Sequence, residues 1–514
     1  MTASAARLFE GAEWDFAKLQ RIHDACEEIA RSELGLDIYP NQIEVITAEQ
    51  MLDAYSSAGM PLFYKHWSFG KHFAHHEAFY RKGLMGLAYE IVINSSPCIS
   101  YLMEENTATM QTLVIAHAAF GHNHFFKNNY LFKQWTDADG ILDYLDFAKN
   151  YMAQCEERHG RQAVEQTLDA AHALMSHGID RYPGKKNLDL RAEEKRAGER
   201  RQHEESVFND LWRTVPTGKV KSAEVLSSER RRKLLGLPQE NLLYFLEKAA
   251  PRLQPWQREA LRIVRHIAQY FYPQSQTKVM NEGTATYVHY RIMNRLHEQG
   301  RISDGNFLEF LQSHTNVVFQ PDFDDPRFSG FNPYALGFAM MQDIERIVSN
   351  PDDEDREWFP DIAGTGDVMA VLRNTWANYR DESFISQFLS PRLMRKLRMF
   401  HLHDDPEESA GIRVDAIHDE RGYRRVRREL ARQYDVGYID PNIEVVDVDL
   451  AGDRRLMLRH AVVKGAQLNE VDAKRVLQHL ADLWSYDVSL VEVDATDTVL
   501  KEHVVSPRRH AVAA

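Results

Sequence analysis

Two polar clusters, each inside a segment that otherwise has the pattern of a buried helix, constrain this chain most. The first is Val114 to Tyr130 (VIAHAAFGHNHFFKNNY), where three histidines fall within eight positions at the end of an apolar run. The second is Lys278 to Tyr290 (KVMNEGTATYVHY), which carries Glu282 and His289. The sequence predicts that these distant segments meet and form one shared site, and a metal ion is its expected content.

The spacing of His117 and His122 bears directly on a metal site. Two histidines bind one metal well when they are four residues apart, because one helical turn brings both imidazoles to the same side. Here the spacing is five, so on a regular helix the side chains diverge by roughly 140°. A π-bulge, or a helix that ends at Gly121, would repair this. The alternative is a core histidine at 117 and a helix-end histidine at 122 that interacts with the helix dipole. His124 is expected to be a solvated loop residue.

Glu282 and His289 are seven residues apart, nearly two helical turns, and therefore share one face of the predicted helix. Their separation along the helix axis is about 10 Å, so the two are not expected to ligate the same ion. One would ligate while the other contacts the substrate or donates a proton. Capping of the helix start by Asn281 and Glu282 is the alternative, since a carboxylate is favourable near the N-terminal dipole.

The order of these features matches the general zincin arrangement of a strand, a helix with two histidine ligands, and a second helix with a third ligand. The strand is the run Leu87 to Asn94, which is β-branched and bounded by Ser-Ser-Pro. The string NEGTA resembles the NEGxA signature of gluzincin aminopeptidases, in which the glutamate is a zinc ligand. Position 118 is alanine, where those enzymes keep their general base. A hydrolytic mechanism here needs another base, and the candidates are Glu104, Glu105 and His289.

Each residue type in the two clusters predicts a role. The predicted ligands of a divalent metal, expected to be zinc, are His117, His122 and Glu282. The predicted catalytic residues are His289 and Glu105. The residues predicted to bind an anionic or amide-bearing substrate are Lys127, Asn128 and Asn281. For Lys127 and Asn128 the alternative is that they only form the polar C-terminal end of a helix, which is the more common case.

Periodicity and turn signals divide the chain into two domains and a tail, and the fold class is α+β. Residues 1–405 are predicted to form a large, mainly helical domain with a zincin-like strand and helix core, interrupted by a charged excursion at about 185–235. Residues 410–505 follow βαββαβ order, the ferredoxin-like pattern, which begins with the strand GIRVDAIH and a helix at Glu420 to Tyr434. Residues 506–514 are expected to be a disordered tail.

The net charge of -14 argues against a chain built mainly to coat nucleic acid or anionic lipid. The helix at Glu420 to Tyr434 is basic, and its basic face is expected to be exposed to solvent. Three widely separated cysteines form neither a disulfide framework nor a zinc-knuckle spacing. The N-terminus lacks the pattern of a signal peptide, and no apolar run is long enough to span a bilayer. A cytoplasmic protein without a membrane span is expected.

Several long motifs together resemble one protein family. They are LAYEIVINSSPCISYLMEENTATMQTLVIAHAAFGHNHFFKNNYLF, CEERHG, LDAAHAL, GIDRYP, TKVMNEGTATYVHY and NPYALGFAMMQDIER. These closely resemble the stage V sporulation protein R (SpoVR) family, from about Trp14 into the C-terminal region, and the length is similar to that of members from non-sporulating proteobacteria. The resemblance implies a sporulation, stress or stationary-phase role beside a serine protein kinase and a von Willebrand-type protein encoded nearby. The resemblance assigns no catalytic residue to this chain.

Functions from different classes remain open. The leading hypothesis is a metal-dependent hydrolase that acts on peptide or cell-wall-precursor amides. The alternative is a non-catalytic regulatory or scaffold protein that works with the kinase system, in which the polar cluster binds a ligand or orders the core. RNA binding through the basic helix is a third hypothesis.

Overall fold

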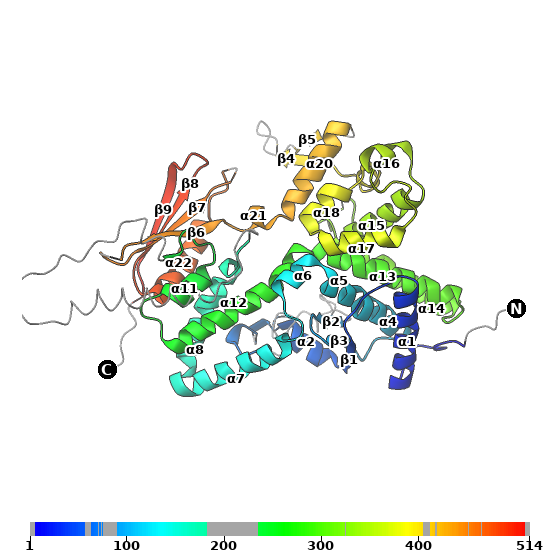
Figure 1. The fold of residues 1–514 in the computed structure, drawn as a ribbon, viewed down its shortest axis with the longest axis horizontal. Helices are drawn as coiled ribbons and strands as arrows, with labels where there is room; N and C mark the ends of the chain where they lie inside the picture. Colours follow the sequence, from blue (N-terminus) through cyan, green and yellow to red (C-terminus); the bar gives the residue numbers. More distant parts are fainter. Residues whose placement is uncertain are drawn as a thin grey trace, which may run out of the picture. The chain divides into compact units, whose positions relative to one another are not determined.

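The computed structural model describes residues 6–56, 63–69, 71–72, 75, 90–181, 235–323, 325–404, 412–416, 419–450, 452–463 and 465–508. Their contacts group into two compact units. Unit 1 consists of residues 1–150 and 270–435, and unit 2 of residues 151–269 and 436–514. Helices α7 (Ile141–His159) and α12 (Pro255–Gln276) each pass from one unit into the other. Figure 1 shows that helices dominate the described chain.

Unit 1 contains a sheet formed by β1 (Asn41–Ile46), β2 (Glu90–Ile93) and β3 (Cys98–Met103). Strand β3 lies between the other two, parallel to β1 and antiparallel to β2. Strand β2 falls within the predicted strand at Leu87 to Asn94, whose first three residues lie outside the described part. Neither β1 nor β3 was predicted. Almost every residue of β3 is buried, and a short apolar run without alternation cannot be told from helix by periodicity.

Most helices of the described chain belong to unit 1. In chain order they are α1 (Phe16–Ser32), α2 (Ala48–Ser56), α4 (Ala108–Ile115), the π-helical turn η1 (Ala116–His122), α5 (Asn123–Asn128), α6 (Tyr130–Trp135), α13 (Lys278–Glu298), α14 (Asp304–Val317), α15 (Pro333–Ser349), α16 (Asp353–Trp358), α17 (Val368–Asn378), α18 (Asp381–Phe388), α19 (Pro391–Lys396) and α20 (Glu420–Gln433). The long helices α1 and α15 lie within two residues of the bounds that the sequence predicts, about 14–33 and 333–350, and α13 begins four residues before its predicted start at Glu282. Apolar periodicity marks such long segments, whereas the short helices α16, α18 and α19 carry too few residues to show it.

The core of unit 1 is arranged around α13, which packs against η1 and α15. Glycines allow the backbones of these helices to touch. A Cβ atom at Gly121 would lie 2.5 Å from the Cα of Ala285, and one at Gly283 would lie 2.6 Å from the backbone of Gly337. A side chain at either position would force the helices apart, because packed interiors leave no such room. The side chains that η1 and α13 direct toward each other are therefore within mutual reach.

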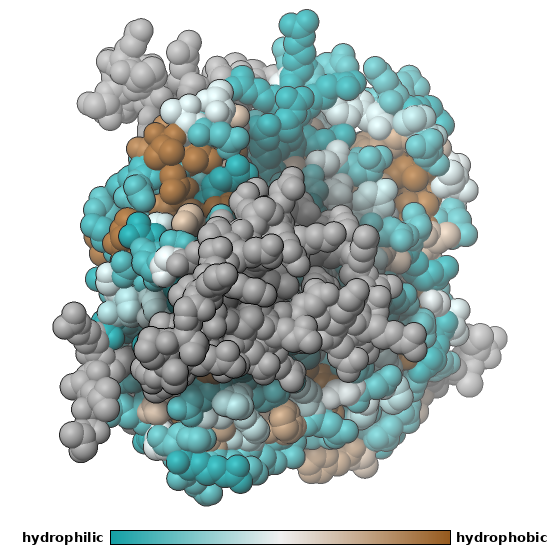
Figure 2. Space-filling view, turned by 60° about the vertical axis from the view of Figure 1, so that its left-hand side comes forward, coloured by the Kyte–Doolittle hydropathy of each residue, from teal (hydrophilic) through white to brown (hydrophobic). Residues whose placement is uncertain are grey.

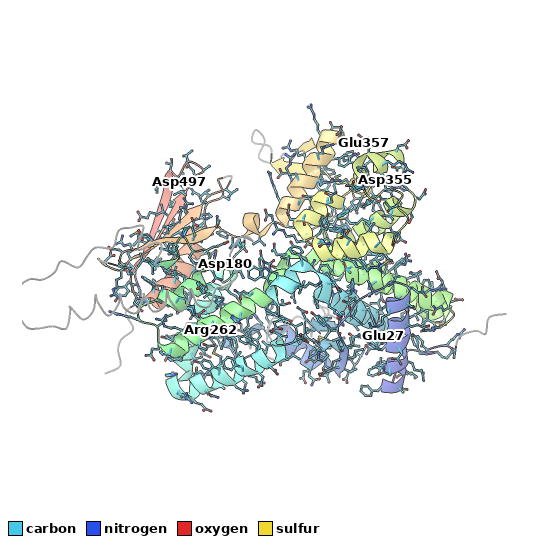
Figure 3. The ribbon with its side chains drawn as sticks, in the orientation of Figure 1. Glu27, Asp180, Arg262, Asp355, Glu357 and Asp497 are labelled. Atoms are coloured by element: carbon cyan, nitrogen blue, oxygen red, sulfur yellow. The ribbon has the colours of Figure 1, made fainter. Side chains whose placement is uncertain are left out.

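Helix α15 is held by an ion pair near its C-terminal end. Arg346 binds the buried carboxylate of Asp355, with 2.7 Å between Nη2 and Oδ1, and it also pairs with Asp343 one turn earlier. Asp355 forms a capping box with Asp352 at the start of α16, where Figure 3 labels it. A buried carboxylate with this many donors is well compensated, so the end of α15 has a fixed position beside α16.

Unit 2 combines helices with a mixed sheet. Its elements are α8 (Arg161–Ala173), the short 3-10 turn η2 (Met175–His177), α11 (Leu242–Ala249), α21 (Val436–Ile439), β6 (Ile443–Val448), β7 (Leu456–Ala461), α22 (Glu470–Trp484), β8 (Val488–Val493) and β9 (Val499–Val505). The strands lie in the order β6-β7-β8-β9, and all neighbours are antiparallel except β7 and β8. Helix α22 makes the crossover between those parallel strands, as parallel pairing requires, and it packs against α8.

The ferredoxin-like order predicted for residues 410–505 is wrong in its first half. The strand expected at GIRVDAIH is β5 (Ile412–Ala416), which pairs with β4 (His401–Asp404), and α20 packs against α18 within unit 1. The C-terminal sheet therefore has ββαββ order. Local pattern marks a strand but does not say which sheet it joins. The coarser prediction is confirmed: a mainly helical protein carries a small C-terminal domain with a sheet of four strands within the described residues.

Two other expectations fall largely outside the described residues. The charged excursion at about 185–235 and the tail residues 509–514 are not described. Among the residues that are, no helix combines the length and apolar character needed to cross a membrane. Figure 2 shows a coloured surface that is mostly hydrophilic, with separate hydrophobic patches.

Candidate metal centre

His117 and His122 both lie in η1, where the hydrogen bonds of the helix follow a π-helical repeat. The i→i+5 repeat of a π-helix places residues five apart about one turn apart. The spacing that conflicts with an α-helix is therefore suited to η1, and the π-bulge considered from the sequence is present. The two imidazole rings are 4.6 Å apart between centroids and nearly perpendicular, at 88°. Both side chains are buried.

Glu282 comes from the first turns of α13, and the start of this helix is capped from elsewhere in the chain. The buried carboxylate of Asp381 accepts hydrogen bonds from the backbone N–H groups of Val279 and Met280, both at 2.8 Å. These are among the donors that a helix N-terminus leaves unsatisfied. Because Asp381 caps the helix, the side chain of Glu282 is directed toward η1 and not used as the cap.

Three donor atoms from the predicted ligands converge. The Nε2 atoms of His117 and His122 lie 3.7 and 3.6 Å from the same oxygen of Glu282, Oε2. A tetrahedral zinc ion with bonds near 2.1 Å separates its donor atoms by about 3.4 Å, so the observed spacing is close to what one cation requires. Both nitrogen-to-oxygen distances are too long for a hydrogen bond.

Two of these atoms are buried polar groups without a hydrogen bond. Among the described residues, neither Nε2 of His117 nor Oε2 of Glu282 has a hydrogen-bond partner. Such atoms are costly and call for an explanation, of which a missing water or ion is the most direct. A cation between the imidazole nitrogens and the carboxylate oxygen would satisfy both, so the residues present fit a metal ion.

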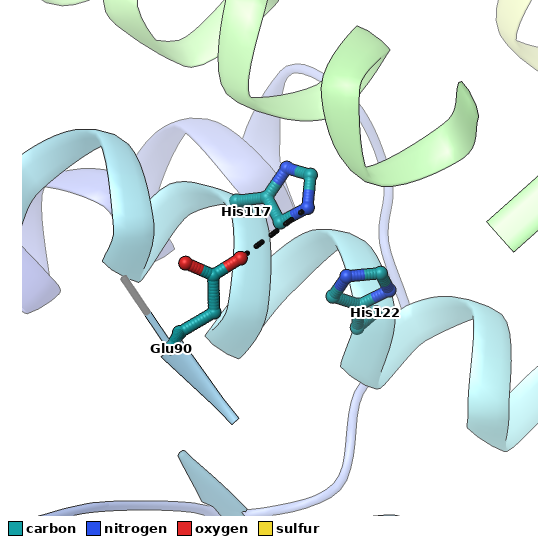
Figure 4. Close-up of side chains that lie close together, drawn as sticks. All are labelled: Glu90, His117 and His122. Atoms are coloured by element: carbon teal, nitrogen blue, oxygen red, sulfur yellow. Dashed lines mark ion pairs between the residues drawn. The ribbon is translucent and has the colours of Figure 1, made fainter. Parts of the chain in front are cut away.

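Glu90, the first residue of β2, brings a second carboxylate to the cluster. Its Oε1 lies 3.8 Å from Nε2 of His117, and donor atoms of Glu90, His117 and His122 all lie within 4.8 Å of one another. Figure 4 shows the carboxylate pointing toward the ring of His117 from the strand, while both histidines project from η1. The side chains of Glu90 and Glu282 are 19% and 18% exposed, against 4% for His117. These two side chains are therefore less buried than that of His117, although Oε2 of Glu282 itself is buried.

Burial and nearby charges shift the pKa values of these groups in different directions. Burial lowers the pKa of His122 to about 4, so its ring is neutral at pH 7. Burial alone would raise the pKa of Glu282, but the adjacent His122 and His117 and a hydrogen bond from Tyr334 outweigh it, and the pKa is lowered. For Glu90, burial outweighs the attraction of His117 and the pKa is raised. Of the two carboxylates, Glu282 is the readier anion and Glu90 the readier proton acceptor.

Two further buried histidines form a chain of contacts that begins at the other ring nitrogen of His117. Its Nδ1 lies 2.9 Å from Nδ1 of His289, and Nε2 of His289 lies 2.9 Å from Nδ1 of His314 in α14. Burial lowers the pKa of His289 well below its usual value and that of His314 to about 4, so both rings are neutral at pH 7. Glu282 and His289 thus lie near opposite nitrogens of His117.

The residues predicted to bind substrate make contacts within the protein. Oδ1 of Asn281 lies 2.8 Å from Nδ1 of His122, which fixes the orientation of that ring. Lys127 forms an ion pair of 2.6 Å with Asp37, and Asn128 donates to the backbone carbonyl of Asp37 at 2.8 Å. Lys127 and Asn128 therefore tie α5 to the segment that precedes β1.

Two other residues from the sequence lie apart from the cluster. Glu105 is exposed in the turn between β3 and α4, and the structure does not bring it to the buried histidines. His124 was expected to be solvated, and this prediction is wrong: the side chain is buried, with Nδ1 2.9 Å from the carbonyl oxygen of Asp37. The reason is that α5 continues directly from η1, so no loop separates His124 from the core.

Together these features describe a mainly helical protein with a candidate His–carboxylate metal centre. Residues 13–439 match the family model described as SpoVR like protein, and residues 441–495 match the SpoVR-like C-terminal domain. The chain therefore belongs to the SpoVR family, as its motifs predicted. It is 52% identical over 490 residues to the uncharacterized protein YcgB of Escherichia coli (strain K12), and the match covers 95% of this chain and 94% of that protein. No solved structure matches the chain.

Three residues of the centre were not predicted from the sequence. Glu90 had a usable signal, because it is the acidic residue within the apolar strand run LAYEIVIN. Tyr334, which stacks on the ring of His117 at 6.2 Å, and His314 had none. A tyrosine after Asn-Pro at a helix start and a lone histidine within a helix are both common in structures without any metal.

Proposed function

We propose that this protein is a metal-dependent hydrolase whose single-ion centre is held by His117, His122 and Glu282. The observation that supports this most is that the Nε2 atoms of His117 and His122 lie 3.7 and 3.6 Å from Oε2 of Glu282, and that two of these three atoms are buried without a hydrogen bond. Two imidazoles and a carboxylate are a donor set that suits zinc. A bound zinc ion would polarise a carbonyl group and make a water molecule more acidic.

Glu90 is the residue that we assign as general base. In the HExxH arrangement the base follows the first histidine, but here that position is the buried Ala118. The side chain of Glu90 is 19% exposed, and burial raises the pKa of its carboxylate, which makes it the better proton acceptor of the two carboxylates. Glu90 would take a proton from the attacking water and return it to the leaving amine, so the proton count balances. Glu105, which is exposed, does not meet this requirement.

The substrate class that we propose is an amide of a peptide or a cell-wall precursor. Support for this part comes from the chemistry of the donor set and from the likeness of NEGTA to the gluzincin signature. Membership of the SpoVR family supports a role in sporulation or stress, together with the serine protein kinase and the von Willebrand-type protein. His289 is buried and contacts Nδ1 of His117, so we assign it to the metal centre rather than to the substrate.

Metal analysis of the purified full chain tests this function. After incubation with zinc and desalting, elemental analysis should find about one equivalent per chain. Glu282→Gln keeps the shape of the side chain but removes its charge, and this variant should lose most of the metal. Glu105→Gln is the matched control, because that glutamate is exposed and apart from the cluster. A wild-type protein that binds no zinc, or a Glu282→Gln variant that binds it normally, would refute the proposed centre.

A further inference from the structure

We propose that His289 and His314 form a one-way hydrogen-bond relay that holds His117 in its metal-binding tautomer. This inference rests on the proposed metal centre and adds two positioning residues to it. His314 is the more distant of the two and lies on α14, a helix that contributes no donor atom to the proposed ligand set.

The first step of the relay follows from the tautomers of imidazole. A neutral imidazole has one N–H donor and one nitrogen that accepts. The 2.9 Å contact between His117 and His289 joins two Nδ1 atoms, so only one of them carries the proton. If Nε2 of His117 offers its lone pair to a metal, the proton of that ring must be on Nδ1. His117 therefore donates and His289 accepts.

The second step follows from the first. Because Nδ1 of His289 accepts, its proton is on Nε2. That atom lies 2.9 Å from Nδ1 of His314, which must accept in turn. Each tautomer is thus set by the one before it, and the relay has one direction when His117 ligates through Nε2.

The opposite direction leaves a buried donor without an acceptor. If His314 donated to His289 and His289 to His117, the proton of His117 would be on Nε2. The carboxylate oxygens that face this atom are at 3.7 Å on Glu282 and 3.8 Å on Glu90, which is beyond hydrogen-bond distance. An unsatisfied buried N–H is costly, so the surroundings of Nε2 favour a lone pair that meets a cation.

Aromatic packing fixes the far end of the relay. The ring of His314 lies 4.8 Å from that of Phe338 and 5.1 Å from that of Tyr290, and Phe310 packs on the ring of His289 at 6.1 Å. Ligating histidines usually donate their second N–H to a carboxylate, a carbonyl or water. Here a neutral and rigid pair of histidines takes that place, and both rings are buried.

The test compares His314→Asn with His314→Gln in the full chain. The Oδ1 atom of asparagine can stand near the position of Nδ1 and accept from His289, whereas the oxygen of glutamine lies one bond farther along the side chain. Zinc affinity is measured by competition with a chromophoric chelator. His314→Gln should weaken zinc binding by about 10- to 100-fold, the usual cost of losing an outer-shell partner, and His314→Asn should bind close to wild type. Thermal unfolding of the metal-free proteins verifies that both variants fold.

The outcomes separate the relay from the metal centre. If His314→Gln binds zinc as tightly as wild type, or if both variants weaken binding equally, the relay is wrong while the centre at His117, His122 and Glu282 stands. If the wild-type protein binds no zinc, the proposed function fails and the relay with it. If His314→Gln does not fold, His314→Leu replaces it as the variant without an acceptor, with the same expected loss.

Discussion

At the scale of single residues, Glu90 and Glu282 show how position decides the chemistry of a carboxylate. Both lie at the same cluster, but Glu282 faces two imidazoles and a tyrosine hydroxyl, which stabilise its charge. Glu90 lies beside His117, but burial dominates and raises the pKa of its carboxylate. Groups whose environments push their pKa values apart can take different roles in one site. Glu282 is therefore suited to ligation, and Glu90 to proton transfer.

This difference predicts the behaviour of Glu90→Gln. The variant should keep metal binding close to wild type, because the three proposed ligands remain. Hydrolysis should fall by about 10²- to 10⁴-fold, the range expected when a general base is removed. The measurements are metal content per chain and release of products from a mixture of peptides and cell-wall-precursor peptides, followed by mass spectrometry. Loss of metal to the same extent as in Glu282→Gln would instead make Glu90 a ligand.

The residue scale also shows which site residues a sequence can reveal. His117, His122 and Glu282 stood out because polar side chains within apolar helical runs are unusual, and the structure brings all three together. Lys127 and Asn128 stood out for the same reason, yet they bind Asp37. A polar residue in an apolar segment indicates that a partner exists, but its identity depends on which distant segment packs there.

At the scale of elements, η1 converts an unfavourable spacing into a usable one. Its π-helical repeat places His117 and His122 on one side, and Gly121 lets η1 approach α13 closely enough for Glu282 to meet them. π-bulges are frequent at functional sites, and they persist where the surrounding packing over-determines them. The contact between η1 and α13 is that packing here.

Gly121→Ala tests the importance of this contact. The added Cβ would lie 2.5 Å from the Cα of Ala285, so η1 and α13 must separate. Overpacking of this kind costs about 1–3 kcal/mol of stability, and zinc binding should weaken because Glu282 moves away from the histidines. Thermal unfolding and zinc titration measure the two effects.

Gly305→Ala is the matched control for this prediction. A Cβ there would meet Ser303 Oγ at 3.8 Å, an ordinary contact, and the position is exposed within α14. Alanine is the better helix former, so this variant should be as stable as wild type or slightly more so. If Gly121→Ala behaved like Gly305→Ala, close contact between the helices would not be needed for the metal centre.

The elements also show where prediction from sequence stops. Long helices such as α1, α13 and α15 were located to within a few residues, because buried apolar side chains recur along their length. Strands β1 and β3 were missed, because β3 is buried along almost its whole length and β1 is half-buried along almost all of its length, so neither shows alternation. Helix α13 begins before Glu282 because Asp381 caps it, and a cap supplied from about a hundred residues away leaves no local signal.

At the scale of the whole molecule, the candidate centre is confined to unit 1. Its proposed ligands come from η1 and α13, its proposed base comes from β2, and the relay adds α14, all of which belong to the same compact unit. The four-stranded sheet and α22 belong to unit 2 and contribute no residue to it. A ligand stabilises the state that binds it, so the effect of metal should be largest in unit 1.

Hydrogen exchange measured with and without zinc tests this separation. Peptides that cover η1 and α13 should exchange more slowly when zinc is present, because metal binding opposes local opening. Peptides from β6, β7, β8 and β9 should be unchanged. The Glu282→Gln protein serves as the control and should show no protection in either unit. Equal protection of the C-terminal sheet would mean that the centre is coupled to unit 2.

The sequence by itself determined the family, the helical character, the long amphipathic helices and the three residues of the proposed donor set. These follow from motifs and periodicity, which are properties of neighbouring residues. Only the tertiary structure decided that β5 and α20 join unit 1, that Glu90 and His314 reach His117, and that Lys127 binds Asp37. Each of these depends on which segments pack together in the folded chain, for example 27 positions apart for Glu90 and His117 and 90 for Lys127 and Asp37, and such contacts are chosen by the free energy of the whole fold.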